Sequence, residues 1–293
     1  MENQIISFLT QLLARSANPK GLDWLSKQAD KITSEAIPST FFLAFSQSSR
    51  YFKKEKISFS ADDSAKANQL TSGFEPQFWN QLQTARTVLM LSYPQQKESW
   101  FATMNQLFET ADMHEHQALF AALPLMPFQE DLIPRAIDGL RTNISLVFDA
   151  IALDNPFPAK YFPEANWNQM VLKAIFMQHP LYRIQGLKER RNPALAAIAR
   201  DFAHERWAAG RVVMPEIWRL VAPFVNDMYL DDLKKALATK DQLQVKAVLL
   251  TLKESAYAPA KELLESLPAQ ESSLDREAIA WETVGSAFQL TRV

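Results

Sequence analysis

Cysteine is absent from this chain of 293 residues, and glycine is scarce, with only 6 residues. The lack of cysteine excludes disulfide bonds, zinc sites with cysteine ligands and iron–sulfur clusters. A β-rich protein of this length would need more glycine in its turns, and we find neither a sustained alternating strand pattern nor a Gly-rich phosphate loop. We therefore expect no Rossmann-type or P-loop chemistry.

An excess of charge of one sign and long apolar runs are missing as well. The net charge is −2 and the pI is about 6.1, so no overall field attracts nucleic acid. No segment approaches the roughly 18 apolar residues that a membrane span needs. The N-terminal M-E-N-Q also lacks the basic region of a secretory signal. These absences predict a cytoplasmic protein with no transmembrane segment and no nucleic-acid partner.

What the sequence does contain is apolar residues at helical spacing. Phe78, Leu82, Ala85 and Leu89 follow one another at intervals of four, three and four residues, which places them on one face of a helix. The 16 prolines fall between such segments, where helices start and stop. The pattern predicts an all-α fold.

The predicted helices form pairs that recur roughly every 30–50 residues, without a sharp sequence repeat. This is typical of a degenerate HEAT-like helical-repeat array, or α-solenoid, in which each pair buries its face against the next. A compact, non-repeating bundle is the alternative. The predicted pairs are 76–92 with 97–110, 113–123 with 129–140, 143–153 with 164–177, 193–209 with 214–223, and 227–238 with 241–254.

A polar segment suggests where the chain divides. Residues 53–75 contain the charged K-K-E-K and D-D-S sequences and read as a linker. We therefore predict an N-terminal helical unit (1–52), a linker-like segment (53–75), a helical-repeat body (76–265) and a C-terminal tail (266–293). The tail is predicted to hold a short helix near Asp275 to Phe288.

Two clusters contain potential metal ligands. His114 and His116 are two residues apart, a spacing that does not bring side chains together on a helix, and we interpret them as a solvated helix start. Asp227, Asp231 and Asp232 have the spacing of a Mg²⁺ site on a helix. Basic residues follow them directly, which favours an exposed charged face. We expect no metal and no cofactor.

His204 is the histidine best placed for a function. It shares one stripe of a predicted helix with Asp201 and Glu205, which are like charges one turn apart and repel unless a cation lies between them. The nearest cations in sequence are Arg190, Arg191 and Arg211. One interpretation is a buried arginine–carboxylate network, and the other is a polar ligand pocket built by His204 and these arginines.

Two neighbouring features extend this region. From Arg183 to Arg211 the chain has seven basic and three acidic residues, which indicates either a concave site for an anion or ion pairs between helices. Upstream, Asn166, Trp167 and Asn168 open a helix that carries Lys173 on its polar face. Trp167 falls on the apolar stripe and is predicted to lie in the core, whereas the amides and the lysine either line a groove or serve packing.

Several co-linear segments of this region resemble the EboA family. They are D-N-P-F-P-A-K-Y-F-P-E-A-N-W-N-Q-M-V-L-K from Asp154, P-L-Y-R-I from Pro180, R-R-N-P-A-L from Arg190, A-H-E-R-W-A-A-G-R from Ala203, and R-T-N from Arg141. The resemblance spans about Pro76 to Leu264 and is densest from Ile137 to Val225. It implies an accessory protein of a bacterial secondary-metabolite gene cluster, associated with moving a precursor towards the periplasm. It implies no catalytic residue, because no activity is assigned to this family.

We therefore favour a non-enzymatic scaffold or binding protein that helps to handle or export a pathway precursor. Its expected partner is another protein of the same cluster, or an anionic or prenylated small molecule. The alternative is an enzyme that acts on a phosphorylated or prenylated intermediate with His204 as acid/base. The predicted binding surface consists of Asn166, Trp167, Asn168, Lys173, Arg183, Arg190, Arg191, Asp201, His204, Glu205 and Arg211.

Overall fold

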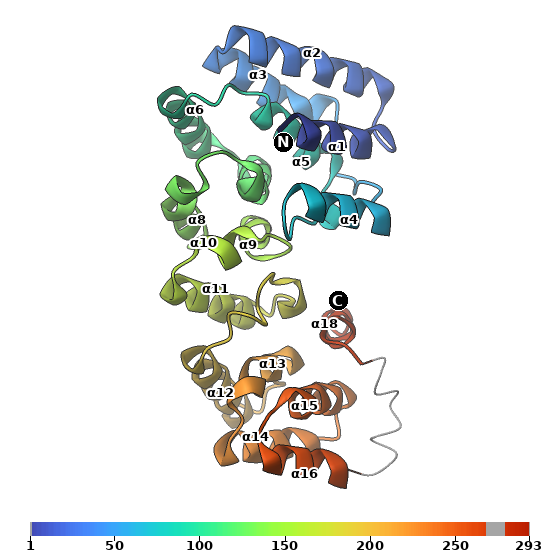
Figure 1. Ribbon diagram of the computed structural model, residues 1–293, viewed down its shortest axis with the longest axis vertical. Coiled ribbons are helices and arrows are strands. Elements are labelled where there is room, and N and C mark those ends of the chain that lie inside the picture. The colour runs from blue at the N-terminus through green and yellow to red at the C-terminus, as the bar shows by residue number, and fades with distance from the viewer. Residues whose placement is uncertain (1, 268–278, 293) are drawn as a thin grey trace. The chain divides into compact units, whose positions relative to one another are not determined.

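The computed structural model describes residues 2–267 and 279–292, and in these ranges the chain is helical without a β-strand. The prediction of an all-α protein is therefore confirmed. Contacts between helices divide the chain into two compact units, residues 1–162 and residues 163–293. Figure 1 shows the helices of each unit, with α1–α10 in the first and α11–α18 in the second.

The first unit contains ten helices in its described part. Their bounds are α1 (Glu2–Ala14), α2 (Pro19–Glu35), α3 (Pro38–Gln47), α4 (Ala61–Leu70), α5 (Gln81–Leu91), α6 (Lys97–Thr110), α7 (Met113–Ala121), α8 (Ile133–Gly139), α9 (Ser145–Ala152) and α10 (Phe157–Tyr161). A short 3-10 helix, η4 (Gln129–Leu132), precedes α8.

Helix α5 is the centre of the first unit, because all of its residues are buried. It packs against α1, α2, α3 and α7, and α7 in turn packs against α9. Its one cation, Arg86, is 3% exposed and donates to Glu115 at 3.1 Å and to the Phe45 carbonyl at 3.3 Å. A buried charge needs such partners, so the core here is held by polar contacts as well as apolar ones.

The segment 53–75, expected to be linker-like, contains α4. Ser60 caps this helix and forms a capping box with Asp63. Asp63 also accepts from Arg15, the residue that follows α1, at 2.8 Å, which ties α4 to the end of the first helix. The Arg15 guanidinium holds the pKa of the Asp63 carboxyl well below its usual range.

The second unit contains seven described α-helices. They are α11 (Glu164–Met177), α12 (Pro193–Ala208), α13 (Trp218–Val221), α14 (Asp227–Ala238), α15 (Gln242–Glu254), α16 (Ala258–Ser266) and α18 (Trp281–Leu290). Two 3-10 helices matter below, η5 (Leu181–Arg183) and η6 (Pro215–Ile217). The predicted start of the last helix, at Asp275, lies outside the described residues, and α18 begins at Trp281.

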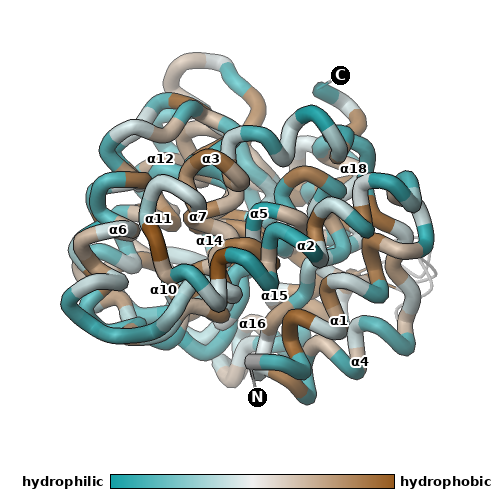
Figure 2. The backbone as a smooth tube through the Cα atoms, turned by 90° about the horizontal axis from the view of Figure 1, so that it is seen from above, coloured by the Kyte–Doolittle hydropathy of each residue, from teal (hydrophilic) through white to brown (hydrophobic). Residues whose placement is uncertain are grey.

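Helix α15 forms the core of the second unit. It packs against α13, α14, α16 and α18, and the chain returns in α18 to lie also on η5 and η6. Most of its apolar residues between Leu243 and Leu252 are buried, on more than one side of the helix. Along most helices the hydropathy changes from turn to turn, as expected for amphipathic helices that bury one face (Figure 2).

Side-chain caps explain why several helices begin where they do. The Asn192 side chain accepts from the Leu195 amide, with Pro193 in the first turn of α12. Asn226 and Asp241 cap α14 and α15 in the same way. Gly210, just after α12, has φ +64°, the left-handed geometry expected of a glycine that ends a helix.

Candidate functional site

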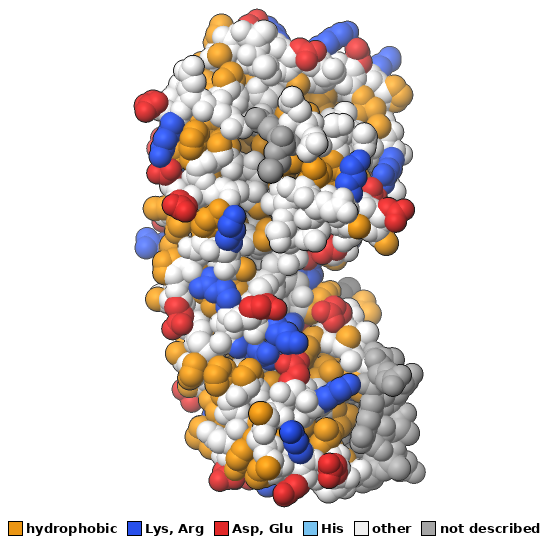
Figure 3. Space-filling model, in the orientation of Figure 1, with side chains coloured by type: hydrophobic (Ala, Val, Ile, Leu, Met, Phe, Trp, Pro, Cys, Tyr) orange, Lys and Arg blue, Asp and Glu red, His pale blue; other side chains and the backbone are white. Residues whose placement is uncertain are grey.

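The residues of the predicted binding surface all lie in the second unit, on α11, η5, the segment before α12, α12 itself and the turn that follows it. On the face shown in Figure 3, Lys and Arg side chains gather over α11 and the segment that follows it, with acidic side chains among them. The structure distributes the predicted residues over three separate groups.

The first group joins the start of α11 to the start of α12. Trp167 is fully buried, as predicted, and the Arg190 guanidinium lies over its ring at 4.6 Å. Asn168 and Asn192 exchange amide hydrogen bonds of 3.2 and 2.9 Å. Cation–π contact and a reciprocal amide pair both stabilise packing, so these side chains connect two helices.

Three further residues of the predicted surface lie near this group. Asn166 and Lys173 are two turns apart on α11 and therefore share one face of it. Burial lowers the pKa of Lys173, and it also lowers the pKa of Arg190, although Glu164 opposes the second shift. Lys173, Arg183 and Arg190 all have interactions with other groups of the chain, so none is a free cation.

The second group surrounds Arg191, whose side chain is only 9% exposed. Arg191 donates to Glu254 of α15 at 2.7 Å and to the Arg219 carbonyl of α13 at 2.9 Å. Trp281 of α18 donates to the other Glu254 oxygen at 3.0 Å. Burial by itself raises the pKa of Glu254. The hydrogen bonds from Arg191 and Trp281 and the positive charge of Arg191 lower this pKa by more, so it ends below its ordinary value. Arg191 is thus an internal link rather than a surface residue.

Beside it lies Glu216, which follows Pro215 in a pattern that suits the first turn of a helix. It is fully buried in η6 and accepts from the backbone amides of Leu181 and Tyr182 at 3.2 and 2.5 Å. Its carboxylate is 4.0 Å from the Arg219 guanidinium. Burial raises the pKa of Glu216 to about 8, against the opposing influence of Arg219 and the two amides. The carboxyl group is therefore mostly protonated at neutral pH.

The signal for this buried pair was present in the sequence. Glu216 and Arg219 are three residues apart within the apolar run M-P-E-I-W-R-L-V, where a charged pair has little chance of reaching solvent. The Arg219 guanidinium also lies 5.5 Å from the Trp281 ring of α18. Helix α18 therefore covers a polar cluster, not a purely apolar one.

The third group lies between α12 and α14. His204 Nε2 is 2.6 Å from one Asp232 carboxylate oxygen, and Arg200 Nε donates to the other at 2.7 Å. The Asp232 side chain is 7% exposed and that of His204 is 42% exposed. Asp232 was missed as the partner of His204, although it shares a helical stripe with the buried residues Tyr229, Leu233 and Ala236 of α14.

One turn further along, aromatic and cationic side chains continue the contact between α12 and α14. The Lys235 ammonium lies 4.2 Å from the centre of the Trp207 ring, and Trp207 also contacts His204 and Trp218. By contrast, Asp201, Glu205 and Arg211 are exposed. In the described part of the chain no cation forms an ion pair with Asp201 or Glu205.

The predicted residues do not converge on one pocket. His204 follows Asn192 by twelve residues of α12, which is about 18 Å along the helix axis. Arg190 and Arg191 lie before Asn192, and each is held by another group of the unit. An anion bound by these two arginines would therefore be remote from His204.

In both clusters of potential metal ligands, the side chains contact other residues and do not converge on one point. His116 contacts the Phe108 carbonyl at 2.9 Å and stacks on Phe120, while Asp112 caps α7 together with Glu115. Asp227, Asp231 and Asp232 contact Tyr257, Lys234 and His204 respectively. Over residues 2–267 and 279–292 we find no group of three His, Asp or Glu side chains arranged to hold a metal ion.

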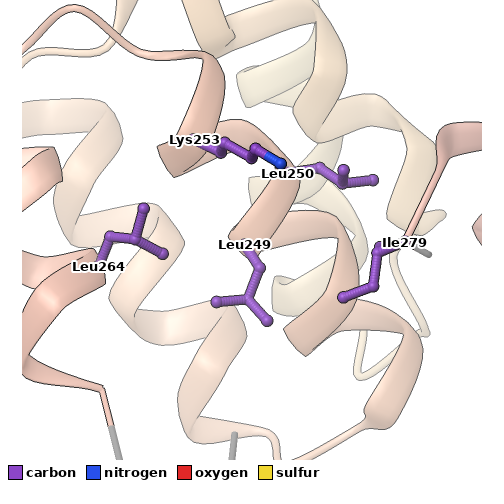
Figure 4. A pocket seen from close by; sticks show the side chains of 5 residues that line it. All are labelled: Leu249, Leu250, Lys253, Leu264 and Ile279. Atoms are coloured by element: carbon purple, nitrogen blue, oxygen red, sulfur yellow. The ribbon is translucent and has the colours of Figure 1, made fainter. Parts of the chain in front are cut away.

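A small apolar hollow lies between α15 and α16 (Figure 4). It is lined by Leu249, Leu250, Lys253, Leu264 and Ile279, and its volume is about 150 Å³. Sites for small-molecule ligands usually measure about 300–1,000 Å³. This hollow is therefore small for a metabolite. Among the described helices, none combines the length and the apolar character needed to cross a bilayer.

Comparison with known proteins identifies the family. The sequence model of the family described as "metabolite traffic protein EboA" matches residues 5–222. Comparisons with curated proteins and with solved structures gave no match. The matched range includes α11, α12 and η6, which carry part of the three groups described above, and ends before α14, α15 and α18, which carry the rest. Because this match covers well over half of the 293 residues, the chain belongs to the EboA family of metabolite traffic proteins.

Proposed function

We propose that this chain is a non-enzymatic binding protein in metabolite traffic, whose helix pairs stack as a HEAT-like α-solenoid. Its partner is another protein of the same bacterial secondary-metabolite gene cluster, or an anionic or prenylated intermediate, and it acts in the cytoplasm. The family description supports the traffic role. The absence of a convergent catalytic constellation in the described residues supports binding rather than catalysis.

The observation that carries this proposal is that polar residues of α11 and α12, and of the segment before α12, contact other helices. Arg191, Asn168 and His204 each contact a residue of another helix or of the segment before it. A reaction would need these groups to face an open cavity. Here they hold helices together. Recognition then depends on the surfaces that these helices expose.

The exposed side of α12 is the part of the predicted surface that we propose as the docking face. Asp201 and Glu205 are one turn apart and exposed, and their mutual repulsion costs about 0.2–0.5 kcal/mol. Arg211 is exposed just beyond the helix end. A partner with basic groups facing the two carboxylates would relieve this repulsion.

Native mass spectrometry of the full chain, purified gently from its own host, tests the proposal. We expect a co-purifying cluster protein or small molecule, with protein crosslinks to α12. The double variant Asp201→Lys, Glu205→Lys should lose the protein partner, whereas Asp30→Lys on the exposed side of α2 should retain it. A bare polypeptide in every preparation would contradict the proposal.

One observation favours the alternative, an enzyme that uses His204. An aspartate oriented on a half-exposed imidazole is the arrangement that general acid–base catalysis uses. In that case His204→Gln abolishes turnover of a phosphorylated or prenylated intermediate and leaves the stability of the protein nearly unchanged. Under the binding proposal the same change lowers stability, because it removes a contact between α12 and α14.

A further inference from the structure

The first unit has a larger hollow that none of the predicted site residues touches. It lies where η4 meets α10, and its volume is about 410 Å³, within the range of small-molecule sites. Its lining combines aromatic, amide and carboxylate groups: Met126, Phe128, Gln129, Glu130, Asp131 and Tyr161.

Phe128 holds an unusual backbone conformation in the wall of this hollow. Its φ is +56°, the left-handed region that residues with bulky side chains rarely adopt. Its ring is fixed by aromatic contacts with Trp100 at 5.8 Å and Phe101 at 5.6 Å. Backbone strain of this kind persists where the surroundings impose it, and it occurs often at ligand sites.

The polar part of the wall is fixed as well. Gln129 donates from its amide nitrogen to the Pro124 carbonyl at 2.6 Å, and its amide oxygen accepts from the Tyr161 hydroxyl at 2.5 Å. The orientation of both side chains is thereby set before any ligand arrives. The Tyr161 oxygen keeps lone pairs that can accept a further hydrogen bond.

Acidic side chains line the hollow, and lysine side chains lie beside it. Glu130 is exposed, and Asp131 forms an ion pair with Lys97 at 2.8 Å. Lys97 also lies 5.6 Å from the Phe128 ring, and Lys160 lies 4.9 Å from the Tyr161 ring. Carboxylate acceptors thus line the hollow, and ammonium donors lie beside the aromatic residues of its wall.

We propose that this hollow binds a neutral polyhydroxylated ring, such as a sugar or a cyclic polyol. Hydroxyl groups donate to Glu130, Asp131 and Tyr161 and accept from the neighbouring lysines, while C–H bonds of the ring pack on the Phe128 ring. This inference rests on the proposed function, because it names the class of metabolite that the protein carries.

Two other ligand classes fit the wall less well. An ammonium ligand offers donors only and would compete with Lys97 and Lys160 for the carboxylates and the ring faces. A carboxylate or phosphate ligand would meet Glu130 and Asp131, two like charges at the mouth of the site. A hydroxylated ring has both donors and acceptors and carries no charge that either set would repel.

Saturation-transfer NMR on the full chain tests the proposal, with myo-inositol and D-glucose as polyol probes and choline and benzoate as charged probes. We expect saturation transfer to a polyol, strongest at its C–H protons, and little to the charged probes. Glu130→Gln should weaken polyol binding about tenfold, the effect of losing a hydrogen bond to a charged acceptor. Tyr161→Phe should weaken it as well.

A matched variant controls for general surface effects. Glu109→Gln changes another exposed carboxylate, on α6 and outside the hollow, and this variant should bind the polyol as the wild type does. Equal binding by Glu130→Gln and wild type, transfer to choline alone, or no transfer to either polyol would overturn the inference. The proposed function has a separate test: a metabolite of another class, carried by the protein from its host, would leave that function standing and remove the polyol site.

Discussion

Gly285 of α18 lies so close to Glu216 that a Cβ atom on Gly285 would stand 2.6 Å from the Glu216 carboxyl carbon. The same Cβ would stand 2.3 Å from a ring carbon of Tyr182. Helix α18 therefore contacts η5 and η6 through its backbone, and only glycine allows this approach. The contact joins residues almost seventy positions apart in the sequence.

Replacement of Gly285 by alanine should destabilise the second unit. Alanine is the better helix former by about 1 kcal/mol, which alone would stabilise α18. The added methyl group overlaps Glu216 and Tyr182, and such overpacking costs about 1–3 kcal/mol. We expect a net loss of up to about 2 kcal/mol in the free energy of urea unfolding.

Ser286→Ala is the matched control, because Ser286 is the next residue of α18 and is exposed. It should change the unfolding free energy by less than about 0.5 kcal/mol. If Gly285→Ala were as stable as Ser286→Ala, α18 would not pack on Glu216 as described.

Glu216 should make stability depend on pH. Its pKa is raised to about 8 by burial, while its ordinary value is 4.5. Between these values the folded state keeps a proton that the unfolded state has released. Stability from this group is therefore full below about pH 4.5 and is lost as the pH rises to about 8, with a slope of at most about 1.4 kcal/mol per pH unit.

Urea unfolding at several pH values between 5 and 9 measures this slope. Glu216→Gln should remove the part of the slope that comes from the Glu216 carboxyl group. The variant should be less stable than the wild type at acid pH, because both carboxyl oxygens accept backbone hydrogen bonds and the amide can replace only one. The difference should shrink as the pH rises. An unchanged slope in Glu216→Gln would contradict the raised pKa.

Much of the fold could be predicted because its signals are local. The caps at Asn192, Asn226 and Asp241 and the glycine at Gly210 act within one turn, so the sequence shows them directly. Most of the predicted helices agree with the observed bounds within a few residues, but three are divided. The helix predicted at 76–92 is a 3-10 turn (Pro76–Phe78) followed by α5, that at 129–140 is η4 followed by α8, and that at 214–223 is η6, α13 and a further 3-10 turn.

The site could be predicted less well because its contacts are distant in sequence. The partner of His204 lies on the next long helix, and that of Arg191 lies 63 residues away on α15. Helical spacing shows which face a residue occupies but not which helix covers that face. Glu216 illustrates this, since a Pro-Glu pair that suits an exposed first turn becomes buried once α18 returns over it. The division of the chain after residue 162 likewise has no linker-like composition to mark it.

Arg191 should prove to be structural. Arg191→Ala removes the ion pair with Glu254 and leaves that partly buried carboxylate with Trp281 as its remaining hydrogen-bond donor. Loss of one partner of such a pair usually costs about 3–5 kcal/mol when both are fully buried. Glu254 is 26% exposed, so we expect about 2–3 kcal/mol by thermal or urea unfolding.

Lys188→Ala provides the comparison, because Lys188 is exposed and lies in the same segment. It should leave the unfolding free energy within about 0.5 kcal/mol of the wild type. Equal stability of the Arg191 and Lys188 variants would instead indicate that Arg191 is available to an external partner.

Asp232 should matter more for stability than His204 does. Asp232→Ala removes the acceptor of two side chains at once, Arg200 and His204, whereas His204→Ala leaves the Arg200 pair intact. We expect about 2–3 kcal/mol for the first change and about 1 kcal/mol for the second. A double-mutant cycle between positions 204 and 232 should give a coupling energy of at least about 0.5 kcal/mol. No coupling would mean that the 2.6 Å contact does not hold α12 to α14, and would strengthen the case for His204 as a catalytic group.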